Sequence, residues 1–228
     1  HGRTIGAMSA TGNMNSHEMF GPVIDGLIRI EFNDIEAFKS AVHDNRDIAA
    51  VLMETIQGEG GIVSCDKEYL KTVRDICSDK KILLMIDEVQ SGFCRTGKWF
   101  SYQHSNILPD VVMVAKALGN GIPIGACLAR NEAAKVLQAG MHGSTFGGNH
   151  LSTSIGLEVL DIMRDEQICT HVSEMSILLK KQLESKISNF TSVTDIRVYG
   201  FMVGIELKNN CAELVLKALQ KGLVINVT

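Results

Sequence analysis

Residues 81–130 read KILLMIDEVQSGFCRTGKWFSYQHSNILPDVVMVAKALGNGIPIGACLAR, and this stretch decides the fold. Within it lie two short apolar runs, residues 82–86 and 111–115, and each is followed by a charged residue, Asp87 or Lys116. Such runs are typical of strands that are buried on both faces of a parallel sheet. Because the ligand crevice of an open α/β sheet lies beyond the carboxyl ends of its strands, we expect Asp87 and Lys116 to lie close together at that edge.

A carboxylate and an amine at one sheet edge suit pyridoxal phosphate. A lysine amine forms a Schiff base with the aldehyde of this cofactor, and Lys116 is the candidate. An ionised aspartate keeps the pyridine nitrogen protonated so that the ring can accept electrons, and Asp87 is the candidate. The alternative is that both residues are ordinary strand-end charges in water, and their spacing alone does not decide between the two interpretations.

The composition is that of an ordinary globular protein. The 228 residues are 45% hydrophobic and 21% charged, with a formal net charge of −4, which is enough material for a sizeable core. There is no basic excess to indicate a nucleic-acid partner, and no apolar run reaches the roughly 18 residues of a membrane span. The first residues, HGRTIGAMSATGN, show neither a secretory pattern nor an initiator Met, so we expect a fragment of a longer protein.

The six cysteines are spread widely along the chain, and none forms a C-x-x-C pair. Their spacing therefore indicates neither a zinc site nor a disulfide framework. Scattered cysteines in a chain of this size suit a reducing compartment, so we expect a cytoplasmic protein.

The order of the predicted elements changes once along the chain. A helix at 35–42, which Asn33 or Asp34 could cap, is followed by a strand at 48–53 that ends at Glu54, a helix at 66–78 and the strand at 82–87. A short strand is expected at 125–129, and a helix from Asn149 or Ser152 to about Arg164. Beyond it we expect a helix at 166–188, paired strands at 193–199 and 202–207, a helix at 212–220 and a strand at 223–227. The chain thus divides into a large domain, 1–164, and a smaller one, 165–228.

Two glycine-rich loops allow alternative interpretations. The segment GFCRTGK at 92–98 has the spacing of a nucleotide P-loop, but Trp99 stands where Ser or Thr would bind magnesium. The segment GSTFG at 143–147 resembles a hydrolase nucleophile elbow, with Thr145 in the serine position. A threonine hydroxyl and the amides of a glycine-rich loop suit a phosphate group better, and a simple turn before a helix is the remaining alternative.

Six motifs, taken in order, carry a resemblance to a known family. They are HGRT at 1–4, ETIQGEGG at 54–61, DEVQ at 87–90, RTG at 95–97, AKAL at 115–118 and HGSTFGGN at 142–149. The set resembles the class III aminotransferases, which are pyridoxal-phosphate enzymes of fold type I, and is most similar to the acetylornithine and ornithine aminotransferases. The resemblance extends from His1 to Thr228. It implies an α/β large domain with a mostly parallel sheet flanked by helices, and the start of a smaller α+β C-terminal domain.

The resemblance also implies roles for cofactor-binding residues. Lys116 matches the Schiff-base lysine, and Asp87 matches the partner of the pyridine nitrogen. Val89 matches the residue packed against one ring face, and Gln90 the residue near the ring hydroxyl. Thr145 matches a residue that reaches the phosphate of the neighbouring subunit's cofactor, which implies a homodimer with shared sites.

Three further residues match positions near the substrate. Arg3 matches the arginine that grips a substrate carboxylate, for which a guanidinium is suited because it binds bidentately. Glu59 matches the glutamate that gates the side of the site that receives the amino acid. Glu54 matches a strand-end acid near the cofactor.

The implied reaction moves the side-chain amino group of N-acetylornithine to 2-oxoglutarate, a step of arginine biosynthesis, without a metal. Ornithine or another ω-amino acid is the alternative donor, and a non-catalytic scaffold subunit of the same fold is a third alternative. The family pattern further implies that the N-terminal third and the C-terminal end are missing here, and it leaves a mitochondrial or plastid location open. Two departures are His150, where the family usually has Pro, and Asn120, where Gly is common.

Overall fold

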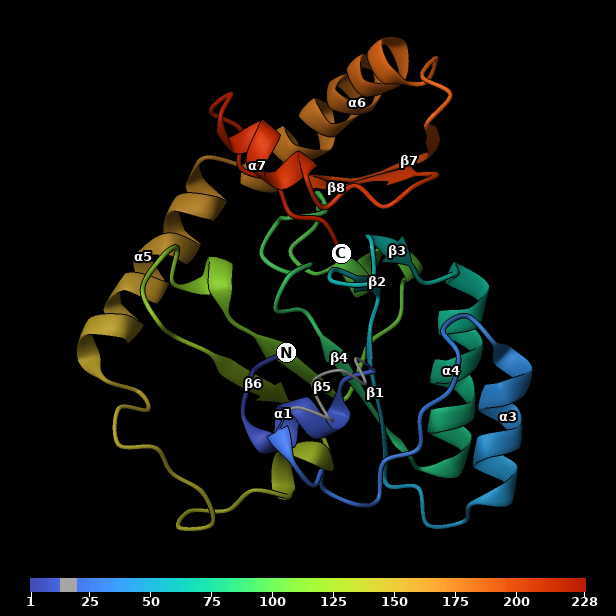
Figure 1. The fold of residues 1–228 in the computed structure, drawn as a ribbon. Helices are drawn as coiled ribbons and strands as arrows, with labels where there is room; N and C mark the ends of the chain where they lie inside the picture. The colour runs from blue at the N-terminus through green and yellow to red at the C-terminus, as the bar shows by residue number, and fades with distance from the viewer. Residues whose placement is uncertain (13–19) are drawn as a thin grey trace. The chain divides into compact units, whose positions relative to one another are not determined.

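The structure is a computed structural model that describes residues 1–12 and 20–228 (Figure 1). These residues form two compact units. The first consists of His1–Thr55, Cys65–Gln90 and Tyr102–Leu160, and the second of Ile56–Ser64, Ser91–Ser101 and Asp161–Thr228. Two short segments from the first half of the chain therefore belong with the C-terminal residues. The domain bounds expected from the sequence, 1–164 and 165–228, stay a prediction.

A four-stranded sheet forms the centre of the first unit. Its strand order is β1 (Ala50–Glu54), β4 (Leu83–Asp87), β5 (Val111–Val114) and β6 (Ala126–Ala129). The first three strands are parallel, and β6 pairs with β5 in the antiparallel direction. The connection from β5 to β6 holds only turns and a short 3₁₀ helix, Lys116–Leu118, which is too little chain for a parallel crossover. The predicted fold class, a mostly parallel sheet flanked by helices, is confirmed.

Two helices, α3 (Ile35–Asp44) and α4 (Lys67–Lys80), lie beside this sheet (Figure 1). Alternate residues of β4, Leu84 and Ile86, are fully buried and belong to one hydrophobic cluster with Phe38 of α3 and Val73 of α4. Burying an apolar side chain of this size contributes about 1.5–3 kcal/mol. Because a slip of one residue would turn this set to the other face, the cluster sets the register of β4 and hence the place of its last residue, Asp87.

Polar side chains begin the helices, as the sequence predicts. Asp34 accepts a hydrogen bond from the amide of Ala37 (2.8 Å) at the start of α3. The neighbouring Asn33 accepts one from the amide of Asp66 (2.9 Å), just before α4. At the start of α5 (His150–Asp165), Asn149 accepts one from the amide of Ser152 (3.0 Å), so Asn149 is the cap.

The second unit contains two small antiparallel pairs and two helices. β2 (Ile56–Gln57) pairs with β3 (Val63–Ser64), and β7 (Val193–Tyr199) pairs with β8 (Met202–Leu207). The helices are α6 (Ile168–Ile187) and α7 (Leu214–Leu219). The strand expected at 223–227 is wrong, because these residues form no regular element. Among the described residues no helix has the length and apolar character to cross a membrane.

One disulfide lies within the second unit. Cys94, in the segment after β4, is bonded to Cys169 at the start of α6, and their Cα atoms lie 4.6 Å apart. The cysteines are separated by 75 residues, and their spacing did not indicate this pair.

Candidate active site

The carboxyl ends of three strands of the first unit bring polar residues to one edge of the sheet. Glu54 is the last residue of β1 and lies directly opposite Asp87, the last residue of β4. Asp87 in turn lies opposite Met113 of β5, and Lys116 follows three residues later. The structure therefore brings Glu54, Asp87 and Lys116 to the same edge, as the sequence predicts.

Asp87 is buried, with 5% of its surface exposed, and its carboxylate accepts several hydrogen bonds. The amide of Val89 donates to its Oδ1 over 3.0 Å, so that the chain turns back toward the carboxylate directly after β4. The ring Nδ1 of His1 lies 3.0 Å from the same oxygen. His1, which opens the first quoted motif, therefore lies at this edge as well, and the sequence alone indicates no role for it.

Lys116 has a backbone conformation that only few non-glycine residues adopt. Its φ is +44°, in the left-handed region, and it begins the 3₁₀ helix at the end of β5. Left-handed conformations of residues other than glycine store strain and gather at functional sites. The residue as a whole is exposed at this edge of the sheet.

The residue after Asp87 is a buried acid with a structural contact. Glu88 is fully buried, and its Oε1 accepts a hydrogen bond from the amide of Tyr102 over 3.0 Å. Burial raises the pKa of Tyr102, and the nearby Glu88 carboxylate raises it further. Glu88 therefore holds the 3₁₀ helix Ser101–Ser105 against the end of β4 instead of facing a ligand.

The remaining predicted residues of the first unit lie in loops. Val89 and Gln90 are half-buried in the turn after β4. Arg3 is exposed just before α1 (Ile5–Ala10). Thr145 is exposed in the glycine-rich loop before α5, next to Phe146, which is 80% exposed.

Glu59 belongs to the second unit. It is exposed at the tip of the β2–β3 hairpin, in the loop formed by residues 58–62. The P-loop interpretation of residues 92–98 finds no support, because turns and the 3₁₀ helix Ser101–Ser105 follow this segment where a P-loop needs the start of an α-helix.

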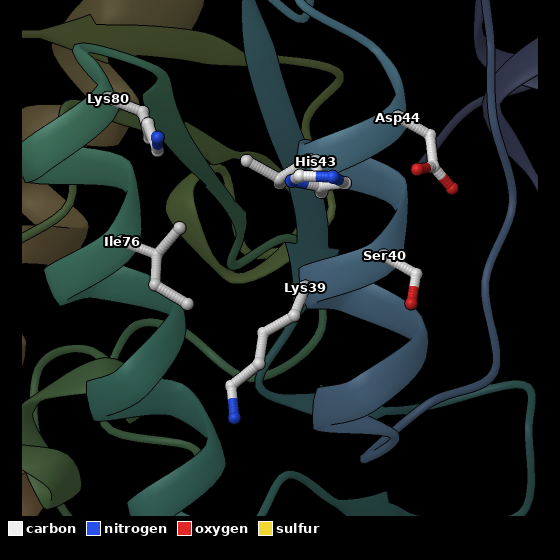
Figure 2. A pocket seen from close by; sticks show the side chains of 7 residues that line it. Lys39, Ser40, His43, Asp44, Ile76 and Lys80 are labelled. Atoms are coloured by element: carbon white, nitrogen blue, oxygen red, sulfur yellow. The ribbon is translucent and has the colours of Figure 1, made fainter.

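A groove of about 430 Å³ between α3 and α4 is a separate feature (Figure 2). It is lined by Lys39, Ser40, Val42, His43, Asp44, Ile76 and Lys80. All of these residues except Lys39 lie in the second halves of the two helices, which lead into the amino ends of β1 and β4. The groove is therefore at the opposite end of the strands from Glu54 and Asp87, and it is no part of the candidate site.

The whole chain matches a known family. The sequence profile described as "Aminotransferase class-III" covers residues 1–228. The chain belongs to the class III aminotransferases. The predicted resemblance is thus confirmed, and the family implies pyridoxal phosphate as the cofactor.

Named relatives are similar over the full length of this chain. The acetylornithine aminotransferases of Nitrosomonas europaea and Methanocaldococcus jannaschii are each 43% identical to it over 228 residues. This chain spans 58% of the first of these proteins and 57% of the second. Among solved structures, the ornithine aminotransferase of Toxoplasma gondii superposes with a TM-score of 0.92 at 32% identity, over 98% of this chain and 54% of that one. The acetylornithine aminotransferase of Elizabethkingia anophelis gives a TM-score of 0.81 at 33% identity, over 87% of this chain and 51% of that one.

The residues at the sheet edge fit the cofactor of this family. A buried carboxylate suits a protonated ring nitrogen, and Asp87 is buried at the end of β4. A lysine amine suits an aldehyde, and Lys116 follows the end of the neighbouring strand as an exposed residue. Asp87 and Lys116 are therefore the residues that would hold the two reactive ends of the ring.

Proposed function

We propose that the full protein containing this chain transfers the side-chain amino group of N-acetylornithine to 2-oxoglutarate, as a step of arginine biosynthesis. The observation that carries the proposal is the buried Asp87 and the exposed Lys116 at the ends of adjacent parallel strands, in a chain of this family. Relatives at 40–44% identity named acetylornithine aminotransferase favour this donor.

The proposed roles follow from the chemistry of each side chain. Bound pyridoxal phosphate supplies an aldehyde that takes up the amino group and a ring that draws electrons from the donor. The Asp87 carboxylate keeps a proton on the ring nitrogen, and its hydrogen bond from the Val89 amide holds it in place. The Lys116 Nζ would hold the aldehyde of the cofactor, and as an amine it would serve as the base for the proton on the donor carbon that carries the amino group.

The surrounding residues bind and orient. Val89 would pack against the ring, and Gln90 would lie near the ring hydroxyl. Arg3 would pair with a substrate carboxylate, and Glu59 would line the side that receives the amino donor. Glu54, opposite Asp87 on the neighbouring strand, is the acid beside the cofactor.

A homodimer completes the proposed site. Thr145 is exposed in this chain and lies in a loop with two large exposed apolar residues, Met141 (66%) and Phe146 (80%). Exposed apolar groups gathered beside a polar ligand-binding residue are typical of an interface. The hydroxyl of Thr145 would then bind the cofactor phosphate of the partner subunit.

An ornithine aminotransferase is the alternative, because the solved structures with a TM-score of 0.92 are named so. A panel of amino donors tested against 2-oxoglutarate with the full-length protein decides between the two. Faster turnover of N-acetylornithine than of ornithine supports the proposal, whereas the reverse order supports the alternative. A protein that stays colourless with added pyridoxal phosphate and transfers no amino group would be a scaffold subunit.

A further inference from the structure

The loop that carries Glu59 has a strained conformation. Residues 58–62 connect β2 to β3, and three of them are glycines, so the loop has little conformational preference of its own. Its last two residues, Gly61 and Ile62, both have positive φ, +90° and +57°. For a β-branched residue such as Ile62 this conformation is unfavourable, and it persists only where the surroundings hold it.

Arg197 of β7 holds the loop in this conformation. Its Nε donates a hydrogen bond to the carbonyl oxygen of Gly61 over 3.1 Å, across 136 residues of sequence. Two carboxylates fix the guanidinium, because its Nη1 donates to Asp195 Oδ2 over 2.7 Å and to Glu206 Oε2 over 2.6 Å. The Arg197 side chain is only 19% exposed, whereas the two acids are about half exposed, so the arginine is the inner member of the cluster.

Gly204 of β8 makes room for this contact. It lies directly opposite Arg197 in the β7–β8 pair. A Cβ atom at this position would lie 2.9 Å from the carbonyl oxygen of Gly61 and 3.1 Å from the Cβ of Ile62. Space, not backbone conformation, thus requires a glycine here, because the loop backbone lies directly on the strand.

We propose that Arg197 is a positioning residue for the side of the site that receives the amino donor. It anchors the Gly61 carbonyl, and this fixes where the loop places Glu59, two residues earlier. The proposal rests on the function proposed above, in which Glu59 lines that side. Asp195, Glu206 and Gly204 serve the same end, the first two by orienting the guanidinium and the third by admitting the loop.

Replacement of Arg197 in the full-length protein tests the proposal with two measurements. In Arg197→Met, hydrogen exchange in a peptide spanning residues 56–64 should become about tenfold faster or more, since a hydrogen bond to a charged group is lost. The ratio of kcat/KM for the amino donor to kcat/KM for 2-oxoglutarate should shift by a similar factor. Arg197→Lys, which retains the charge and N–H donors but not the planar fork of the guanidinium, should give intermediate values.

Two further variants separate positioning from simple destabilisation. Gly204→Ala pushes on the Gly61 carbonyl with Arg197 still present, so it should change exchange and the kinetic ratio in the same direction. Val198→Ala trims the residue next to Arg197, which points to the opposite face of the strand, and it should leave both unchanged.

The outcomes are distinct. Wild-type exchange and an unchanged ratio in Arg197→Met would overturn the proposal. An equal loss of every kinetic constant and of cofactor affinity in both Arg197→Met and Val198→Ala would overturn it too, because that pattern indicates a loss of stability of the β7–β8 pair. If the wild-type protein transfers no amino group, the proposed function fails, and the exchange measurement alone still decides whether Arg197 anchors the loop.

Discussion

Asp110 offers a direct test of how the sheet edge is built, because it ties β4 to β5. Its Oδ2 accepts a hydrogen bond from the amide of Leu84 (2.9 Å) and one from the Arg74 guanidinium (2.7 Å). Its own amide donates to the Leu84 carbonyl over 2.8 Å. The carboxylate thus extends the pairing of the two strands whose far ends carry Asp87 and Lys116.

The size of the effect follows from what each substitution leaves behind. Asp110→Asn retains an acceptor for the Leu84 amide but loses the charge opposite Arg74, which we expect to lower the free energy of unfolding by about 1.5–3 kcal/mol. Asp110→Ala also leaves the amide of the fully buried Leu84 without its acceptor, which should cost about 1–3 kcal/mol more. The alanine variant should therefore be clearly less stable than the asparagine variant.

Urea unfolding of the full-length protein measures both losses, with the exposed Asp79→Asn in α4 as a control expected within about 0.5 kcal/mol of wild type. Burial raises the pKa of Asp110, but the Leu84 amide and Arg74 outweigh it and hold the pKa below its usual value. The stabilisation is therefore present above the unfolded-state pKa of about 3.9 and is lost as the pH falls through the folded-state pKa. Equal stability of the Asp110→Asn and Asp110→Ala variants would refute the reasoning. So would a stability difference between wild type and Asp110→Asn that persists in acid.

Three further predictions concern the proposed site in the full-length protein. Lys116→Ala should fold normally but lose the visible absorbance of the bound cofactor and all turnover; turnover at the wild-type rate would remove Lys116 from the mechanism. Asp87→Asn should slow the half-reaction with the amino donor more than it weakens cofactor binding, because an amide cannot keep the ring nitrogen protonated; an unchanged half-reaction rate would make Asp87 structural. Thr145→Ala should weaken pyridoxal phosphate binding by about 1–3 kcal/mol in a fluorescence titration. Mixing Lys116→Ala chains with chains lacking the Thr145 loop should restore some activity, and no recovery despite subunit exchange would contradict a shared site.

The ends of the strands could be predicted because local sequence decides them. An apolar run that stops at a charge marks both a buried strand and its exit from the sheet, and β4 and β5 end within two residues of the predicted positions. β7 and β8 have the predicted bounds, since Gly200 with a φ of +61° separates two runs of strand-forming residues. By the same logic, the sequence alone predicts that Asp87 and Lys116 lie at the ends of these strands.

The connections between elements were harder to predict from the sequence. The sequence analysis predicts no element at the small β2–β3 hairpin, because two-residue strands leave no periodic pattern. The antiparallel direction of β6 follows from the short link after β5, although a strand pattern at 125–129 carries no direction of its own. The apolar residues at 223–227 matched a strand pattern, but a strand needs a partner, and the described part of the chain gives them none.

Contacts between distant residues were not predictable, and Arg197 shows why. Its acceptor is a backbone carbonyl, which every residue possesses, so residue type at position 61 says nothing about the contact. The one trace in the sequence is Gly204, an isolated glycine inside a strand pattern, which marks the close approach of another backbone. Such a glycine indicates that another segment lies against the strand, but it does not indicate which one. Only the folded chain shows that this segment is the loop that carries Glu59. A residue that positions a site in this way is therefore found from the contact it makes, and its role is decided by measuring the loop that it holds.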